Sequence, residues 1–154
     1  MNVRIAVIAV LALAACGAHH IPGTQINDTP EARAVYGVIE AYRVAAERRD
    51  PEAILALVST QYFDDAGTPD PGDDLDYAQL QKVLPERFRK VSAMRLGITV
   101  REIEVKGDRA TANVFYDGHY RLTTPSGEAA KVASDISQMR FVREGGTWKI
   151  TSGL

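Results

Sequence analysis

Hydrophobic residues recur at three- and four-residue steps over residues 30–49, which predicts an amphipathic helix. Asp28 and Thr29 can each cap its start, and both alternatives give the same helix. Asp50 followed by Pro51 repeats this cap pattern and predicts a short second helix. The folded part of the chain is therefore predicted to begin with two helices.

A third helix is predicted after Asp76, a capping residue, because apolar residues keep the helical spacing from Tyr77 to Val91. Pro85 interrupts this helix. The apolar face stays in register beyond the proline, so we expect a kink, with a stop at Leu84 as the alternative.

From Met94 onward the period changes from helical to alternating, which indicates strands. The apolar parity switches near Arg101, so a bulge or strong twist is expected there. Turns at residues 106–108, 125–127 and 144–146 divide the segment into four strands. Helices followed by an antiparallel meander are typical of an α+β domain whose helices pack on one sheet face.

Residues 64–74 contain five Asp, two Pro and two Gly, a composition that predicts a loop. Clustered Asp residues suggest calcium, but the spacing lacks the order of a calcium-binding loop and its Glu at the twelfth position. A solvated loop without metal is expected.

The start of the chain has the layout of an export signal. Arg4 precedes eleven residues of only Ile, Ala, Val and Leu, which is shorter than the roughly 20 needed to span a membrane. The sequence Leu13-Ala14-Ala15-Cys16 at the end of this run resembles the lipobox of bacterial lipoproteins. The resemblance implies cleavage of residues 1–15 and a diacylglycerol thioether on Cys16. An ordinary secretory signal with an incidental cysteine is the alternative.

The resemblance also implies a location. Two or three acyl chains anchor a protein stably in a membrane. Gly17 stands where an Asp retains many such lipoproteins at the inner membrane, so a cell-envelope protein at the outer membrane is favoured. Residues 16–28 show no apolar period and are interpreted as the lipidated Cys16 and a flexible tether, with the folded domain at 29–154.

The helix at residues 30–49, the Arg49-Asp50-Pro51 junction, the Tyr62-Phe63-Asp64 segment and the terminal Gly146-Thr147-Trp148 resemble the nuclear transport factor 2-like superfamily. Its members include ketosteroid isomerase, scytalone dehydratase and the SnoaL-like cyclases. The resemblance implies a cystatin-like cone of helices wrapped by a curved sheet, around an apolar cavity that suits a small ligand.

Aromatic residues on inward parities or at helix ends are the candidates to line this cavity and bind a ligand: Tyr42, Tyr62, Phe63, Tyr116, Tyr120 and Trp148. Asp135 is the best candidate for a catalytic base, with Tyr116 or Tyr120 as hydrogen-bond donor. Asp117 and His119 share a parity that faces solvent. The face of Asp135 is left open.

Composition removes several classes of function. The chain has 154 residues with a net charge of −2, so no broad basic field is expected to hold nucleic acid. One cysteine excludes an internal disulfide and a multi-cysteine zinc site, and no cofactor or metal is expected.

Three hypotheses remain. The first is an envelope lipoprotein that binds a small apolar molecule or a protein partner, without catalysis. The alternative is an isomerase or dehydratase acting on a small cyclic substrate. The third is a module that forms a homodimer through an outer sheet face carrying Phe115 and Phe141.

Overall fold

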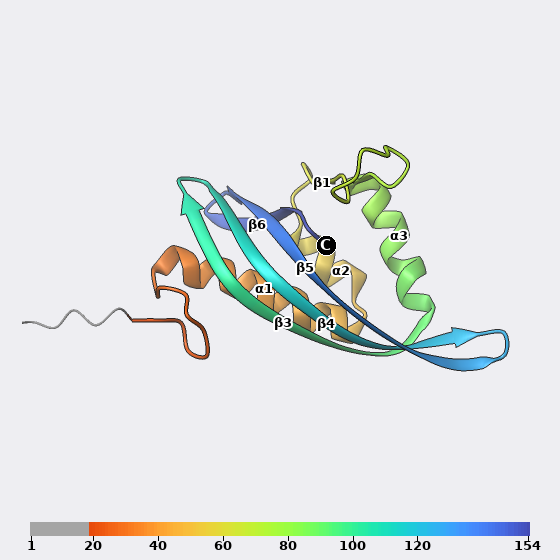
Figure 1. The fold of residues 1–154 in the computed structure, drawn as a ribbon. Helices are drawn as coiled ribbons and strands as arrows, with labels where there is room; N and C mark the ends of the chain where they lie inside the picture. The colour runs from red at the N-terminus through yellow and green to blue at the C-terminus, as the bar shows by residue number, and fades with distance from the viewer. Residues whose placement is uncertain (1–18) are drawn as a thin grey trace, which may run out of the picture.

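The computed structural model describes residues 19–154, so the signal segment and Cys16 lie outside the described residues. The elements follow one another along the chain as α1 Pro30–Arg48, α2 Pro51–Leu57, β1 Phe63–Asp64, β2 Leu75–Asp76, α3 Tyr77–Arg89, β3 Val91–Lys106, β4 Arg109–Thr124, β5 Gly127–Glu144 and β6 Thr147–Ser152. Figure 1 shows the three long strands β3 to β5 as one curved layer.

Local capping explains where the helices begin. Thr29 accepts a hydrogen bond from the Ala32 backbone and starts α1, so it is the cap rather than Asp28, which pairs with Arg33. α1 ends at Arg49 in the left-handed conformation, with φ of 54°. Asp50 then caps α2 directly. A single residue therefore separates α1 from the cap of α2.

Helix α3 runs through Pro85 without ending, as the apolar spacing predicts. Asp76 and Gln79 form a reciprocal capping box at its start. Leu80 and Leu84 are buried on its inner face. The helix therefore turns one continuous apolar face toward the sheet.

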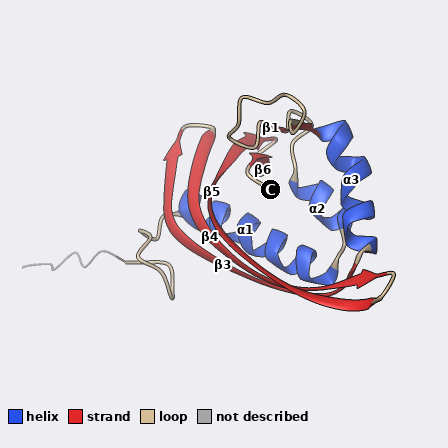
Figure 2. Cartoon of the chain, turned by 45° about the vertical axis from the view of Figure 1, so that its right-hand side comes forward, coloured by secondary structure: helices blue, strands red, loops and turns tan. Residues whose placement is uncertain are grey.

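The sheet is an antiparallel meander in the order β3-β4-β5-β6. The register of β3 and β4 shifts between Val100 and Glu102, which confirms the bulge expected near Arg101. Figure 2 shows the helices on the concave side of the sheet, with the C-terminus between them. Helices inside a curved antiparallel sheet form the cone-shaped α+β fold.

The N-terminal segment differs from the predicted tether. Residues 20–27 form a small hairpin: His20 bridges Asn27, and the Thr24 backbone donates to the Ile21 carbonyl across Pro22-Gly23. Ile21 and Ile26 are each 5% exposed and belong to the core. The prediction of a flexible linker over this stretch is wrong, because burying two isoleucines outweighs the ordering cost of a turn that Pro-Gly already favours.

Strand β5 also differs from expectation. It begins at Gly127, so the loop after β4 is a two-residue turn. Phe141 is opposite Ala110 on the concave face and is 2% exposed, so it is not on the outer face. The outer face expected to carry Phe115 and Phe141 therefore lacks Phe141, because its register with β4 turns that side chain into the core.

Candidate functional site

An apolar cavity of about 330 Å³ lies between α1, α3 and the strands β3 and β4, in the concave side of the sheet. Its volume is within the range of small-molecule pockets. Most of its wall is aliphatic or aromatic: Ala46, Leu80, Leu84, Phe88, Val91, Met94, Leu96 and Leu154, with Tyr42, Arg87, Tyr116 and Tyr120 as the polar members.

The tyrosines supply neutral hydroxyls to this wall. Burial raises the pKa of Tyr42 to about 12, and the nearby Tyr120 adds to the effect while the Arg87 charge opposes it. Burial likewise raises the pKa of Tyr116 and of Tyr120. These phenols therefore stay protonated at physiological pH, and the hydroxyls of Tyr42 and Tyr120 can donate hydrogen bonds to a ligand.

Arg87 is the charged member of the lining. It makes no ion pair within residues 19–154. Sequence reasoning missed it, although Leu80, Leu84 and Arg87 have the i, i+4, i+7 spacing of one helix face. An apolar pocket with one guanidinium favours a ligand that carries an acidic group.

The C-terminal residues are pinned beside the cavity. The Tyr116 hydroxyl donates to the Gly153 carbonyl at 3.0 Å, and the Gly153 N–H donates to Asp64 Oδ2 at 2.6 Å. Gly153 has φ of +94°, and a Cβ there would lie 2.6 Å from the Gln138 carbonyl oxygen. Glycine is therefore required at this crossing.

Asp64 joins that network from the other side, since the Tyr62 hydroxyl donates to its Oδ2 at 3.2 Å. Tyr62 is 2% exposed, and burial raises its pKa. Tyr62 thus supports the chain end and lies outside the apolar lining.

The missing side chain of Gly118 leaves room for the Tyr120 ring. A Cβ at Gly118 would collide with the Tyr120 hydroxyl, so the phenol ring lies across the bare backbone of its own strand. The sequence offers a signal for this, because an isolated glycine inside a strand often marks a close approach.

Asp135 lies directly opposite Tyr116 across the β4–β5 ladder, so it is on the concave face. It is exposed and accepts a hydrogen bond from the Ile136 backbone at 2.7 Å. It lines a second, more polar depression of about 480 Å³, together with Tyr116, Asp64 and the chain end. The structure therefore brings Asp135 and Tyr116 together, and it places Tyr120 in the apolar cavity instead.

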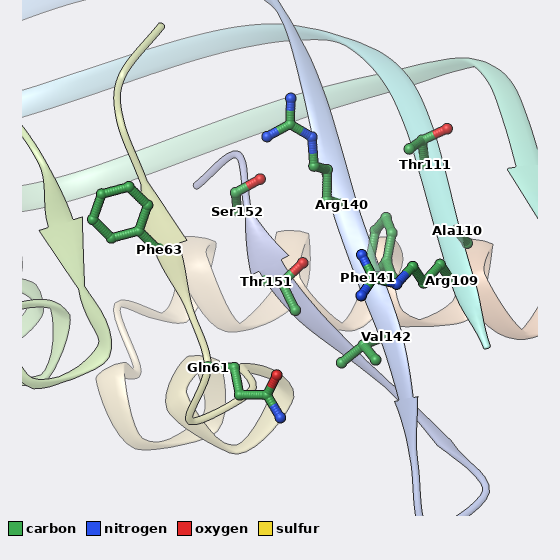
Figure 3. Close-up of a pocket in the computed structure, with 10 residues that line it drawn as sticks. All are labelled: Gln61, Phe63, Arg109, Ala110, Thr111, Arg140, Phe141, Val142, Thr151 and Ser152. Atoms are coloured by element: carbon green, nitrogen blue, oxygen red, sulfur yellow. The ribbon is translucent and has the colours of Figure 1, made fainter. Parts of the chain in front are cut away.

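Phe63 and Trp148 do not reach the apolar cavity. Phe63 is 53% exposed and lines a third depression with Arg109 and Arg140, which Figure 3 shows at the β4–β6 end of the sheet. Trp148 is buried beneath the Arg143 guanidinium, 4.7 Å from the ring centre. Both side chains belong to the opposite end of the strands from the cavity.

The acidic residues act as local caps. In the loop after β1, Asp65 accepts from the Gly67 backbone and Asp70 from the Gly72 backbone. Asp117 and His119 form an exposed pair 3.6 Å apart on the convex face, as their parity predicts. Within the part of the chain that the structure describes, no three acidic, His or Cys residues gather as a metal site.

No protein-family model matches the sequence, and no curated protein matches it at the search threshold. Solved structures do match, and they show the fold. The chain has the cone-shaped nuclear transport factor 2-like α+β fold.

Three of these similar structures indicate the kinds of protein that share the fold. A ketosteroid isomerase-like protein from Erwinia carotovora atroseptica has a TM-score of 0.67 and 17% identity over 82% of this chain and 95% of that one. A candidate dehydratase of the NTF2-like family from Streptomyces avermitilis has a TM-score of 0.62 and 18% identity over 81% of this chain and 95% of that one. A candidate scytalone dehydratase from Novosphingobium aromaticivorans has a TM-score of 0.65 and 16% identity over 80% of this chain and 80% of that one.

Proposed function

We propose that this protein is a cell-envelope lipoprotein whose cone-shaped domain binds a small apolar ligand with one acidic group, without catalysis. The observation that carries the ligand part is the apolar cavity lined by three tyrosines and Arg87. Apolar surface provides affinity there, and a few convergent polar groups fix orientation.

Arg87 decides the chemistry of the ligand. A carboxylate or sulfonate beside it gains a charge-assisted hydrogen bond in a pocket that is mostly apolar. The hydroxyls of Tyr42 and Tyr120 add donors, which suit the same acceptor. Among the described lining residues no Asp, Glu or His side chain is present to act as a base.

Two matched dyes test this proposal. Anilinonaphthalene sulfonate and N-phenyl-1-naphthylamine share one apolar body, and only the first has an anionic group. We expect both to bind and to fluoresce, and Arg87→Gln to weaken the sulfonate about tenfold while changing the neutral dye less than twofold.

Arg89→Gln is the matched control, because Arg89 is an exposed arginine of α3 like Arg87, pairs with Glu86 and does not line the cavity. Leu84→Trp fills the cavity and should abolish binding of both dyes, with circular dichroism to verify folding. Dye binding that persists in Leu84→Trp, or an equal effect of Arg87→Gln on both dyes, would contradict the proposal.

The enzymatic alternative rests on a separate observation: Asp135 and Tyr116 line one depression. As an isomerase, Asp135 would move a proton between two carbons of a small cyclic ketone, with Tyr116 donating to the carbonyl. The Tyr116 hydroxyl already donates to Gly153, which weakens this alternative. Turnover of a β,γ-unsaturated cyclic ketone to its conjugated isomer, lost in Asp135→Asn, would establish it.

Membrane attachment is proposed through Cys16, which lies outside the described residues. No helix within residues 19–154 is long and apolar enough to cross a membrane. Mass spectrometry of the protein from a bacterial host should find Cys16 as the acylated first residue. Cys16→Ser should release the protein from membranes, and Gly17→Asp should move it from the outer to the inner membrane. An intact Met1 with a free thiol would disprove the anchor.

A further inference from the structure

Strand β5 has a long edge that no other strand covers. β4 pairs with it from Gly127 to Val142, but β6 pairs only with Arg140 to Glu144. Gly153 packs on the backbone at Gln138 and Met139. The stretch from residue 128 to 137 is therefore unpaired on its second side. Figure 1 shows this end of the β4–β5 hairpin projecting beyond the helices.

The direction of the backbone groups follows from two hydrogen bonds. The Arg143 N–H donates to Asp108 on the β4 side, and on β4 the Thr123 N–H donates to Lys90 on the β3 side. The β4–β5 register has no shift, so odd-numbered residues of β5 direct their N–H and C=O toward β4. Residues 130, 132, 134 and 136 therefore direct theirs to the free edge, where the Ile136 N–H donates to Asp135 Oδ1 at 2.7 Å.

The other edge of the sheet is protected. The Leu96 N–H of β3 donates to Glu47 at 3.0 Å, and the Val91 carbonyl accepts from Arg49 at 2.7 Å. The bulge near Arg101 further disrupts the regular edge of β3. Proteins usually blunt edge strands by such means, and β5 contains no proline or bulge along its free stretch.

Exposed apolar side chains gather on the free stretch. Val132 and Ile136 are 64% and 61% exposed, and with Phe63 they are the exposed large hydrophobics of the described chain. Both lie on the convex face, where Ile136 is opposite the half-buried Phe115. Both therefore lie exposed on the one stretch of β5 whose edge is unpaired.

The concave face of the same stretch carries one charge of each sign. Lys131 is opposite Tyr120 and Asp135 is opposite Tyr116. Neither forms an ion pair within residues 19–154. They are four residues apart on one strand, too far to reach each other.

We propose that the free edge of β5 pairs with β5 of a second copy of this chain, antiparallel about a two-fold axis at Ala133. In this register Lys131 lies opposite Asp135 of the second copy, twice by symmetry. Among two-fold registers, this is the one that places Lys131 opposite Asp135. Shifting the axis to residue 131 or 135 would instead place like charges opposite each other.

The same register supplies backbone partners. On pairing, the Ile136 N–H exchanges its bond to Asp135 Oδ1 for the Ala130 carbonyl of the second copy, which frees the Asp135 carboxylate to meet Lys131. Val132 of one copy and Ser134 of the other form a hydrogen-bonded pair, since both direct their backbone groups outward. Ala130 lies opposite Ile136 of the second copy, so the convex face gains an apolar pair at each end of the junction. Pairing over residues 130–136 ends before the contact with Gly153. The two four-stranded sheets join into one of eight strands.

Cysteine cross-linking of the full-length chain in detergent tests the register. Ala133 meets its own copy at a non-hydrogen-bonded pair, with Cα atoms about 4.5 Å apart, close enough for a disulfide. Ala133→Cys should form a disulfide-linked dimer, which mass spectrometry would identify as the peptide around position 133 linked to a second copy of itself. Ala129→Cys is on the same face but about 26 Å from its copy, and it should not cross-link.

Charge reversal tests the partner of Lys131. By sedimentation equilibrium, Lys131→Glu should weaken the dimer at least tenfold, because it places Glu opposite Asp135 at both symmetric positions. The double swap Lys131→Asp with Asp135→Lys should restore association to within threefold. Lys82→Glu, an equal charge change on α3, should have no effect.

A protein that stays monomeric at about 100 µM would overturn the proposal. Equal cross-linking of Ala129→Cys and Ala133→Cys, a disulfide from the introduced thiol at position 133 to a different polypeptide, or a double swap that remains as weak as Lys131→Glu would also overturn it.

Discussion

Individual side chains in the cavity act through their protonation and their hydrogen bonds. Tyr42 has its pKa raised to about 12 chiefly by burial, while Arg87 partly offsets this. A phenol that resists ionisation remains a donor, and a guanidinium beside it stays charged. The two residues thus offer a neutral donor and a fixed positive charge within one apolar wall.

Tyr42 gives a prediction for alkaline pH. Its folded pKa is raised above the ordinary value near 10, so its contribution is complete below pH 10 and is lost as pH rises toward 12. We expect the wild-type free energy of unfolding to fall by about 2 kcal/mol more than that of Tyr42→Phe over this interval. Urea unfolding of both proteins at several pH values measures it. Parallel curves would contradict the assigned shift.

Helix α3 is the element that brings the cavity together. It starts at a capping box directly after β2, passes through Pro85, and carries Leu80 and Leu84 on its inner face, with the exposed Arg87 at the rim of the cavity. Its position fixes how far Arg87 reaches into the cavity. The cap at its start therefore supports the site from a distance.

Removal of that cap should destabilise the protein modestly. Asp76→Ala leaves the Gln79 N–H without its side-chain partner and opens the reciprocal bond. We expect a loss of about 1 kcal/mol in the free energy of unfolding. Adding Gln79→Ala should cost little more, since the two groups act as one unit. Lys82→Ala, exposed on the same helix, serves as control, and an equal loss there would count against the capping role.

At the scale of the whole molecule, the hairpin at residues 20–27 closes one end of the cone. Ile26 lies beside Ala32 of α1 and Ile103 and Val105 of β3 around a shallow depression. Should Cys16 carry the proposed lipid, three residues separate it from His20, and the four Cα-to-Cα steps reach at most about 14 Å. The domain would then sit close to the membrane, with this hairpin nearest to it.

The hairpin yields a stability prediction that separates it from a tether. Ile26→Ala should lower the free energy of unfolding by about 3 kcal/mol, because it removes buried methylene groups and leaves a cavity. Gln25→Ala changes the exposed neighbour and should have almost no effect. Chemical denaturation of the two variants measures this difference. Near-equal stabilities would instead support a flexible tether at residues 20–27.

Local signals in the sequence determined the helix starts and the strand irregularity. The Asp50 and Asp76 caps, the continuation through Pro85 and the parity switch near Arg101 depend on residues within a few positions of each other. Nearest-neighbour chemistry therefore suffices for these local features. The cone-shaped fold was predicted from the family resemblance.

Tertiary structure alone decided which faces and which ends meet. Asp135 became a concave-face residue through its register opposite Tyr116, and Phe141 entered the core through the same ladder. Ile21 and Ile26 became core residues once α1 and the sheet offered them a surface. Arg87 reached the cavity because α3 packs across the sheet. Each outcome depends on contacts between segments far apart in the chain, and the alternating or helical period within one segment carries no information about them.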